Sequence, residues 1–243
     1  AIRMKLMDST VCFVCSHLAA HRENALDETP TSTSNPPSSL SFRICDNIRF
    51  KHEDDSFGIL DHQFVFWVSE SIAETEIGDL NYRITSDVPT LKVFDHARDD
   101  LAFLLKKDQL RVSQRAGLAF DDFVEPELKF PPTYKYKKYT TSYDKKEGKK
   151  CRAPAWCDRI LYRIGDGAKL EDVDVEAYDH VMKLSGSDHK PVFAVMTVRV
   201  KDYDDAKLKK TRLRVERELK RTENATAPVN VSLSTNTIDF GSL

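Results

Sequence analysis

Carboxylate, amide and imidazole groups are concentrated in three short strings of this sequence. The strings are GDLNYR (78–83), PAWCDR (154–159) and SDHKPV (187–192). Each string sets an Asp directly before or after an apolar run. Oxygen ligands at the ends of strands are what a metal-assisted phosphoester hydrolase needs. The strings therefore indicate phosphoester hydrolysis, provided that they meet in space.

The first string carries a carboxylate and an amide two positions apart, Asp79 and Asn81. If the string is a strand, both side chains face the same side. A carboxylate and an amide on one face can orient a water and hold a phosphate oxygen. The alternative is an ordinary turn, because Asp and Asn are frequent in turns.

The other two strings, with one isolated residue, offer groups for proton transfer. Asp158 follows an apolar run and precedes Arg159, so its alternative is a simple ion pair with that neighbour. His189 follows Asp188 and is either part of a capped loop or a phosphate ligand and proton carrier whose tautomer a carboxylate fixes. His17 follows an apolar segment and is either structural or a fourth member of the site.

Basic and aromatic residues surround the second string. The stretch 133–139 alternates aromatic residues with lysines, and 145–152 is strongly basic. Lys145 and Lys146 fit a solvated loop. Three other basic residues are candidates for holding a multiply phosphorylated ligand. They are Lys135, Lys150 and Arg152.

Short apolar runs predict the strands that must position these groups. Helical signals cover 95–116, with Asp95 as a candidate N-cap and Leu101, Leu104 and Leu105 on one face. A mixture of Ser, Thr and Pro over 29–41 predicts a loop. The expected strands lie in 3–18, which we expect to be buried, and at 64–68, 160–162 and 192–198. Strands and helices that interleave without a repeat predict an α+β layered sandwich.

Composition narrows the function classes. The chain has 243 residues, 40% of them hydrophobic, and a net charge of -2, which argues against a general nucleic-acid coat. No apolar stretch reaches the length of a membrane span, and no signal peptide opens the chain. The chain has five cysteines, which we expect to be reduced in an intracellular protein. We interpret Cys12 and Cys15 as strand packing rather than a zinc or redox pair.

Five motifs in a fixed order carry a family resemblance. SHLAAH, GDLNYRI, PTYKY, KCRAPAWCDRIL and SDHKPV together resemble the inositol polyphosphate 5-phosphatases of the endonuclease/exonuclease/phosphatase superfamily. The resemblance covers about residues 1–200. It implies a DNase I-like, four-layered α/β/β/α sandwich. It also implies Mg²⁺-dependent removal of the 5-phosphate from phosphoinositides or soluble inositol phosphates.

The resemblance also implies roles for individual residues. Asp79 would orient or deprotonate the attacking water, with Asn81 holding it or a phosphate oxygen. His189 would contact the scissile phosphate and be held by Asp158, and His17 would reach the phosphate. The metal would lie near Asp188. Four residues would grip the 4-phosphate: Tyr134, Lys135, Lys150 and Arg152.

The chain departs from the family pattern in three places. The family's early Asn and its main metal-binding Glu have no counterpart here, so we expect the catalytic domain to be incomplete at its N-terminus. Residues 69–77 intervene before GDLN, and either loop out or displace Asp79. Cys15 stands where the family has Asn, and the stretch after His21 looks shorter and richer in Ser and Pro than in the family.

The last residues change in character. Residues 201–227 predict a charged helical linker, and 228–243 resemble the first strands of the immunoglobulin-like ASH domain that follows the phosphatase in the type II and Lowe-syndrome type enzymes. Through this likeness we expect phosphoinositide or inositol phosphate ligands and protein partners of the ASH-like domain. We also expect a cytoplasmic protein at the surface of endosomal, Golgi or plasma membranes, with no nucleic acid partner. The alternatives are a catalytically inactive binding module and a nuclease of the same superfamily.

Overall fold

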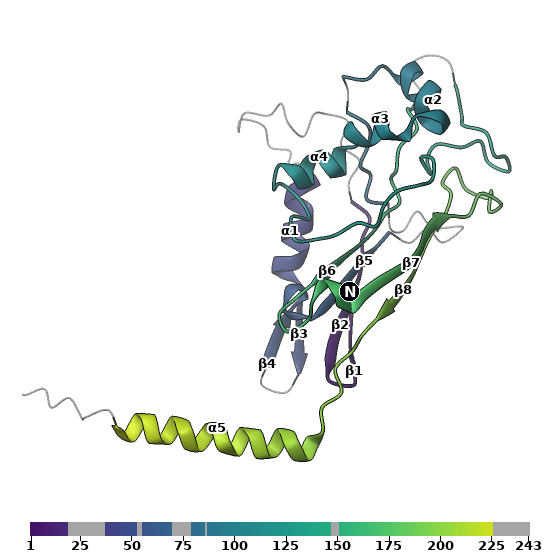
Figure 1. The fold of residues 1–243 in the computed structure, drawn as a ribbon. Helices are drawn as coiled ribbons and strands as arrows, with labels where there is room; N and C mark the ends of the chain where they lie inside the picture. The colour runs from purple at the N-terminus through teal and green to yellow at the C-terminus, as the bar shows by residue number, and fades with distance from the viewer. Residues whose placement is uncertain (19–36, 53–54, 70–78, 86, 147–150, 226–243) are drawn as a thin grey trace, which may run out of the picture. The chain divides into compact units, whose positions relative to one another are not determined.

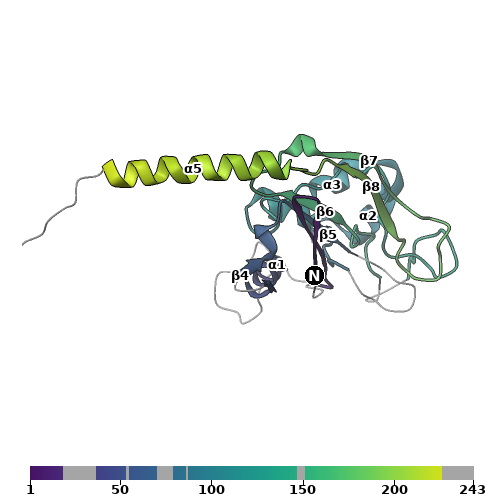
Figure 2. The ribbon, with the colours of Figure 1, turned by 90° about the horizontal axis from the view of Figure 1, so that it is seen from below.

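The computed structural model describes residues 1–18, 37–52, 55–69, 79–85, 87–146 and 151–225. The chain divides into two compact units, Ala1–Lys201 and Asp202–Leu243. Figure 1 and Figure 2 show the ribbon from two directions. Each unit is treated separately below, and the candidate site lies in the first.

A four-stranded sheet forms the centre of the first unit. Its strand order is β1 (Ile2–Leu6), β2 (Ser9–Cys15), β5 (Phe64–Val68) and β6 (Ile160–Ile164). β2 and β5 run parallel, whereas the β1–β2 and β5–β6 pairs are antiparallel. The predicted strands at 64–68 and 160–162 are thereby confirmed.

The side chains of β5 alternate between two cores, as the strand period requires. Val65 and Trp67 face a core that includes Cys45 of α1 (Pro37–Asn47) and Leu110 of α4 (Gln109–Arg115). In Figure 1 both helices lie on one side of the sheet. This face of the sheet is therefore covered by helices.

The opposite face of the sheet packs on a β-hairpin. Phe64, Phe66 and Tyr162 form a core with Val173 of β7 (Val173–His180), and β8 (Val192–Val198) pairs antiparallel with β7. The strand predicted at 192–198 is confirmed. Helices, sheet and hairpin thus form successive layers, which confirms the predicted layered α+β arrangement.

The helix predicted over 95–116 is three helices instead. They are α2 (Thr90–Asp99), α3 (Leu101–Lys106) and α4. Asp95 lies inside α2 and is not an N-cap. The N-caps of α3 and α4 are Asp100 and Asp108, whose side chains accept hydrogen bonds from the Phe103 and Arg111 backbone amides. Each internal Asp thus starts a new helix.

Leu104 of α3 is fully buried in a third core that joins α2 and α3 to residues of 128–160 and β7, and Leu101 and Leu105 pack against the same core. The predicted apolar face is therefore confirmed although its helix is broken. Within the described residues the remaining short elements are β3 (Arg49–His52), β4 (Asp55–Gly58) and two 3-10 helices, Ile59–Asp61 and Leu170–Asp172.

Two other expectations need correction. Helix α1 begins at Pro37, inside the stretch predicted to be a loop, because Pro is well tolerated in the first turn of a helix. Strand β1 was expected to be buried, yet Ile2, Met4 and Leu6 are exposed. β1 is the edge strand of its sheet, with β2 on one side only.

The interpretation of Cys12 and Cys15 as strand packing is confirmed for Cys12 and is wrong for Cys15. Cys12 is fully buried in the core behind β2, whereas Cys15 is exposed, and all five cysteines are free thiols. Within the described residues, no helix has both the length and the hydrophobicity that crossing a membrane requires.

The second unit contains α5 (Asp205–Ala225), a helix whose side chains are almost all exposed and which carries many Lys and Arg residues. The strands expected over 228–243 lie outside the described residues.

Candidate active site

Asp79 lies at the position that continues β5 beyond Ser69. The last described residue after β5 is Ser69, whose N–H donates to the Arg159 carbonyl at 2.9 Å. The Leu80 N–H donates to the Cys157 carbonyl at 3.0 Å, two residues further along the neighbouring segment. On the other side, the Leu18 N–H donates to the Asp79 carbonyl at 2.8 Å. Asp79 therefore takes the place of the residue after Ser69 and is not displaced from the sheet, while residues 70–78 lie outside the described chain.

Asp79 and Asn81 come together through a turn and not through a strand. Asn81 has a φ of 58°, a left-handed conformation that Asn tolerates better than most residues. Its backbone N–H donates to Asp79 Oδ1 at 2.6 Å. The expectation that a strand would place them on one face is wrong, because this local side-chain hydrogen bond closes a tight turn instead.

The buried Asn81 amide is fixed from both ends. Its Nδ2 donates to the Leu18 carbonyl at 2.7 Å and lies 3.3 Å from His17 Nε2. Its Oδ1 accepts a hydrogen bond from Arg83 at 2.7 Å. Since the arginine side chain is a donor only, the amide orientation is settled by its partners.

Asp158 pairs with His189 and not with its neighbour Arg159. His189 Nδ1 lies 2.9 Å from Asp158 Oδ2, and the Thr133 hydroxyl donates to the same oxygen at 2.8 Å. Burial by itself would lower the pKa of His189, but the hydrogen bond and negative charge of Asp158, with Asp79 and Asp188, outweigh it and raise that pKa. This environment favours a cationic imidazole whose Nδ1–H points at a carboxylate.

The other ring nitrogen of His189 faces Asp79. His189 Nε2 and Asp79 Oδ2 are 3.9 Å apart, and both side chains are largely buried. Burial, followed by the charge of Asp158, raises the pKa of Asp79, although His189 and the Asn81 amide act in the opposite direction. A carboxylate with a raised pKa is a better proton acceptor at neutral pH than an exposed one.

Basic and aromatic groups border these residues. The Tyr134 ring lies 4.6 Å from the His189 ring, and its hydroxyl accepts a hydrogen bond from Arg152 at 3.3 Å. Lys135 Nζ lies 3.3 Å from Asp188 Oδ2. Lys150 lies outside the described residues.

Backbone hydrogen bonds join the segments that carry these side chains. Tyr134 and Ala155 exchange two backbone bonds of 2.8 and 3.1 Å. The Lys190 N–H donates to the Thr133 carbonyl at 2.9 Å, and the Tyr136 N–H donates to the Asp188 carbonyl at 2.8 Å. The segment 133–136 therefore runs between the second and third strings and positions both.

The structure thus brings five predicted residues into one place and sets three predicted basic and aromatic groups beside them. The first group is His17, Asp79, Asn81, Asp158 and His189. Within the described residues the second group is Tyr134, Lys135 and Arg152. Their catalytic and binding roles stay predictions.

Comparison with known sequences places this arrangement in a family. The profile of endonuclease/exonuclease/phosphatase family 2 matches residues 1–195. The chain belongs to this family.

Relatives within the family are inositol polyphosphate 5-phosphatases. The chain is 36% identical to the mouse type II inositol 1,4,5-trisphosphate 5-phosphatase over 240 residues, which is 96% of this chain and 21% of that protein. It is 35% identical over 201 residues to the synaptojanin of Caenorhabditis elegans, covering 82% of this chain and 15% of that protein. The chain therefore spans only a small part of these curated relatives.

A solved structure of the family has the same fold. The inositol polyphosphate 5-phosphatase domain of SpSynaptojanin, in complex with inositol (1,4)-bisphosphate and calcium ion, superposes with a TM-score of 0.65 at 30% identity. The match covers 92% of this chain and 58% of that chain. A nitrophorin of Cimex is 24% identical with a TM-score of 0.56, covers 82% of this chain and 58% of that chain, and shows the likeness of fold alone. The predicted DNase I-like fold is supported by these likenesses.

A buried arginine holds the second family motif in place. Arg159 is fully buried and forms ion pairs with Asp108 at 2.9 Å and with Glu125 at 2.5 Å. The Tyr178 hydroxyl lies 3.3 Å from Glu125 in the same cluster. Since Asp158 precedes Arg159 directly, this cluster anchors the backbone that carries the histidine's carboxylate partner.

Sequence reasoning missed Arg83 and Thr133 as members of the site. The Arg83 guanidinium lies 4.2 Å from the centre of the Tyr134 ring and bonds Asn81. Both residues stood inside motifs already noted, Arg83 in GDLNYR and Thr133 in PTYKY, so the motifs held the signal. No local pattern indicates the partners of Arg159, which lie 51 and 34 residues away.

The described residues do not by themselves outline a metal site. Across the described residues, no group of three His, Cys, Asp or Glu side chains is arranged to hold a metal ion. Asp188, predicted to lie near the metal, is paired with Lys135. The carboxylates among the described residues do not form a complete ligand shell, and the role of Asp188 stays a prediction.

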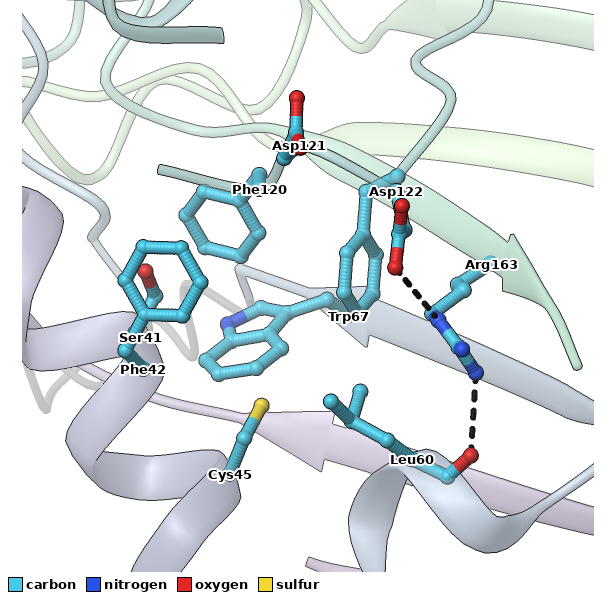
Figure 3. Close-up of a pocket in the computed structure, with 10 residues that line it drawn as sticks. Ser41, Phe42, Cys45, Leu60, Trp67, Phe120, Asp121, Asp122 and Arg163 are labelled. Carbon is cyan, nitrogen blue, oxygen red and sulfur yellow. Dashed lines mark hydrogen bonds and ion pairs between the residues drawn. The ribbon is translucent and has the colours of Figure 1, made fainter. Parts of the chain in front are cut away.

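A separate apolar pocket of about 110 Å³ lies on the helical side of the sheet. Figure 3 shows Trp67 at its centre, with Phe42 and Cys45 of α1 on one side and the Arg163–Asp122 pair on the other. None of the predicted site residues lines it. The Trp67 indole donates to the Ser16 hydroxyl at 2.9 Å, so its polar edge is satisfied.

Proposed function

We propose that this protein hydrolyses the 5-phosphate of phosphoinositides such as phosphatidylinositol 4,5-bisphosphate, or of soluble inositol polyphosphates, in a Mg²⁺-dependent reaction. One observation carries the proposal. The pair Asp158–His189 and the carboxylate of Asp79 lie directly beside a wall of cationic and aromatic groups. Family membership and the inositol phosphate bound by a related structure agree with it.

In the proposed reaction a water oxygen attacks phosphorus while the bond from phosphorus to the ring oxygen breaks, and the ring oxygen takes a proton from solvent and leaves as a hydroxyl group. Asp79 orients the water and accepts its proton, because its raised pKa suits a base. Asn81 holds the water or a phosphate oxygen, and the cationic His189 stabilises negative charge on the phosphoryl group. Catalysis of this kind consists mainly of positioning and charge stabilisation.

The neighbouring phosphate of the ring is gripped by Tyr134, Lys135 and Arg152, with Lys150 as a further predicted ligand. Arg152 already bonds the Tyr134 hydroxyl, and Lys135 is held by Asp188. Cations fixed in this way suit a 4,5-bisphosphorylated ring better than a ring with one phosphate. We infer a preference for the bisphosphorylated substrate.

A divalent cation is part of the proposal. A calcium ion accompanies the inositol bisphosphate in the related structure. A bound Mg²⁺ would neutralise phosphate charge and polarise the phosphoryl oxygen. Because the described residues do not complete a ligand shell, we assign no step to the ion.

The proposed setting is phosphoinositide signalling at the cytoplasmic surface of endosomal, Golgi or plasma membranes. This setting rests on the resemblance of the motifs to the 5-phosphatases, and protein partners would bind through the ASH-like segment. The net charge of -2 agrees with a ligand other than nucleic acid.

The test is phosphate release from a short-chain 4,5-bisphosphorylated inositol lipid and from soluble inositol 1,4,5-trisphosphate, with Mg²⁺ or with a chelator. In a protein extended at its N-terminus by the metal-binding segment that the resemblance implies, we expect turnover that the chelator abolishes and that His189→Asn removes. We expect Lys135→Met to raise the KM for the bisphosphorylated ring about tenfold or more, with less effect on a 5-monophosphorylated ring.

Three outcomes would contradict the proposal. Full turnover in chelator would refute the metal requirement. Binding of the bisphosphorylated lipid without phosphate release would make the protein a binding module. Cleavage of an abasic DNA duplex, with no release of inositol-bound phosphate, would make it a nuclease.

A further inference from the structure

Two loop tips lie together at the end of the β7–β8 hairpin nearest the site. One loop spans 137–142 and the other 181–187. The Tyr139 N–H donates to the Ser185 carbonyl at 2.5 Å. At these tips Tyr139 is 80% exposed and Leu184 is 57% exposed. Two large side chains with apolar surface are therefore presented to solvent by loops that are bonded to each other.

A buried lysine holds the two loops together. Lys190 is fully buried, and its ammonium donates to the Thr140 carbonyl at 3.0 Å and to the Leu184 carbonyl at 3.3 Å. The same ammonium lies 5.0 Å from the centre of the Tyr136 ring. One cation thus bridges the backbones of both tips, so that the exposed side chains are carried on a fixed base.

Exposed basic residues surround the tips. Lys137 and Lys138 precede Tyr139, and Lys183 precedes Leu184. We call these five residues the loop-tip rim: Lys137, Lys138, Tyr139, Lys183 and Leu184. Apolar or aromatic side chains set among lysines are typical of surfaces that enter the headgroup region of an anionic bilayer.

The loop-tip rim is continuous with the candidate active site. Three residues before Tyr139, the Tyr136 N–H donates to the Asp188 carbonyl at 2.8 Å, and Asp188 pairs with Lys135. Four residues after Leu184 comes Asp188 itself. A surface that rests on the rim would therefore lie beside the groups proposed to bind the phosphorylated ring.

We propose that the loop-tip rim docks this protein on an anionic lipid bilayer, with Tyr139 and Leu184 entering the headgroup region and the three lysines binding lipid phosphates and carboxylates. The inference extends the proposed action on phosphoinositides by naming the surface that meets the membrane. It does not require turnover, because any anionic lipid satisfies the chemistry of the rim.

The test uses the full chain and vesicles of phosphatidylcholine with or without phosphatidylserine, free of phosphoinositide. We expect sedimentation with the phosphatidylserine vesicles, and about a tenfold or greater loss of binding in the Tyr139→Ser, Leu184→Ser double variant. The matched control is Leu170→Ser, because Leu170 is 58% exposed against 57% for Leu184. Leu170 precedes β7 whereas Leu184 follows it, roughly 25 Å away along an eight-residue strand.

A fluorescence experiment keeps the proposal testable if the double variant folds poorly. Tyr139→Trp should show a blue-shifted emission on addition of phosphatidylserine vesicles, whereas Leu170→Trp should not. The native Trp67 and Trp156 are fully buried and give a constant background.

Several results would overturn the docking proposal. They are no sedimentation of the wild-type chain, wild-type binding by the double variant, an equal loss in Leu170→Ser, and no emission shift in Tyr139→Trp. If the rim binds a protein partner instead of a bilayer, the wild-type chain should not sediment with the vesicles. Vesicle binding without phosphate release would support the docking proposal and refute the proposed function. Phosphate release from the soluble substrate without vesicle binding would support the proposed function and refute the docking proposal.

Discussion

His189 Nδ1 lies 2.9 Å from Asp158 Oδ2, and this contact joins two residues 31 positions apart in the chain. The carboxylate keeps the proton on Nδ1 and turns Nε2 toward Asp79. The raised pKa of His189 is therefore a property of an assembled site, since Asp158 supplies much of the opposing charge.

Asp158→Asn should lower the pKa of His189 and the rate of phosphate release. The amide keeps the shape of the side chain but removes the negative charge that offsets burial. We expect a loss of about 100-fold or more in kcat and an alkaline limit of activity that moves to lower pH. NMR titration of the His189 ring and a pH–rate profile measure both effects. Asp166→Asn, at an exposed position, is the control, and an unchanged His189 titration in Asp158→Asn would contradict this account.

The same contact predicts how stability depends on pH. The pKa of His189 is higher in the folded chain than its ordinary value of 6.5. Folding therefore gains stability from this group below the unfolded pKa, and that gain is lost as the pH rises through the folded pKa. Asp158→Asn should make the free energy of unfolding fall less steeply as the pH rises. Denaturant unfolding at several pH values would measure this difference.

Much of the site was readable from the sequence because its chemistry is concentrated in motifs. Asp79, Asp158 and His189 stand in three separate strings. Their proximity could be predicted on the assumption that the strands beside these strings end at the same edge of the fold. The turn at Asn81 was not predictable from the sequence. The sequence Asp-Leu-Asn is compatible both with a strand and with a turn closed by a hydrogen bond from the Asn81 N–H to Asp79. The conformation of Asn81 depends on its hydrogen bonds to Leu18 and Arg83, which form only in the folded chain.

The fold was readable where apolar runs are short and bounded, as at Phe64–Val68. It was not readable where polar residues act over long distances. Asp100 and Asp108 divide what looked like one helix, and Asp108 also neutralises Arg159 from 51 positions away. Such a pairing leaves no periodic signal in either segment.

Arg159→Met should destabilise the fold strongly. Removing the guanidinium leaves Asp108 as a buried carboxylate without its cation, and leaves Glu125 with only Arg111 at 3.7 Å, a change that typically costs about 3–5 kcal/mol. Urea unfolding measures the loss. Lys169→Met is the matched control, because Lys169 pairs with Glu171 at the exposed surface and its removal should cost less than about 1 kcal/mol. Equal losses in the two variants would show that the buried cluster has no special weight.

Asp79→Asn should abolish phosphate release and stabilise the fold at neutral pH. Burial and the charge of Asp158 raise the pKa of Asp79, so the folded chain holds its carboxylate in an unfavourable setting at pH 7. With a folded pKa above the unfolded value, wild-type stability falls as the pH rises through that interval. The neutral amide of the Asp79→Asn variant cannot ionise, so the variant avoids this loss. We expect its free energy of unfolding at pH 7 to exceed that of the wild type by an amount on the order of 1 kcal/mol. The gain should shrink toward acidic pH in denaturant titrations, and a variant less stable than wild type at pH 7 would contradict the argument.

Deleting residues 70–78 should preserve both the fold and the position of Asp79. Ser69 and Leu80 bond to Arg159 and Cys157, so Ser69 and Asp79 occupy adjacent positions of one extended strand. Joining them directly closes a strand whose partners are already in place, and it removes the entropic cost of closing a nine-residue connection. We expect a free energy of unfolding equal to or above that of the wild type, with phosphate release retained. The control deletion, 71–78, leaves one extra residue and shifts the register, which turns Asp79 and Leu80 to the opposite faces of the strand. If the longer deletion unfolds the chain while the shorter one leaves it intact, Asp79 does not continue β5.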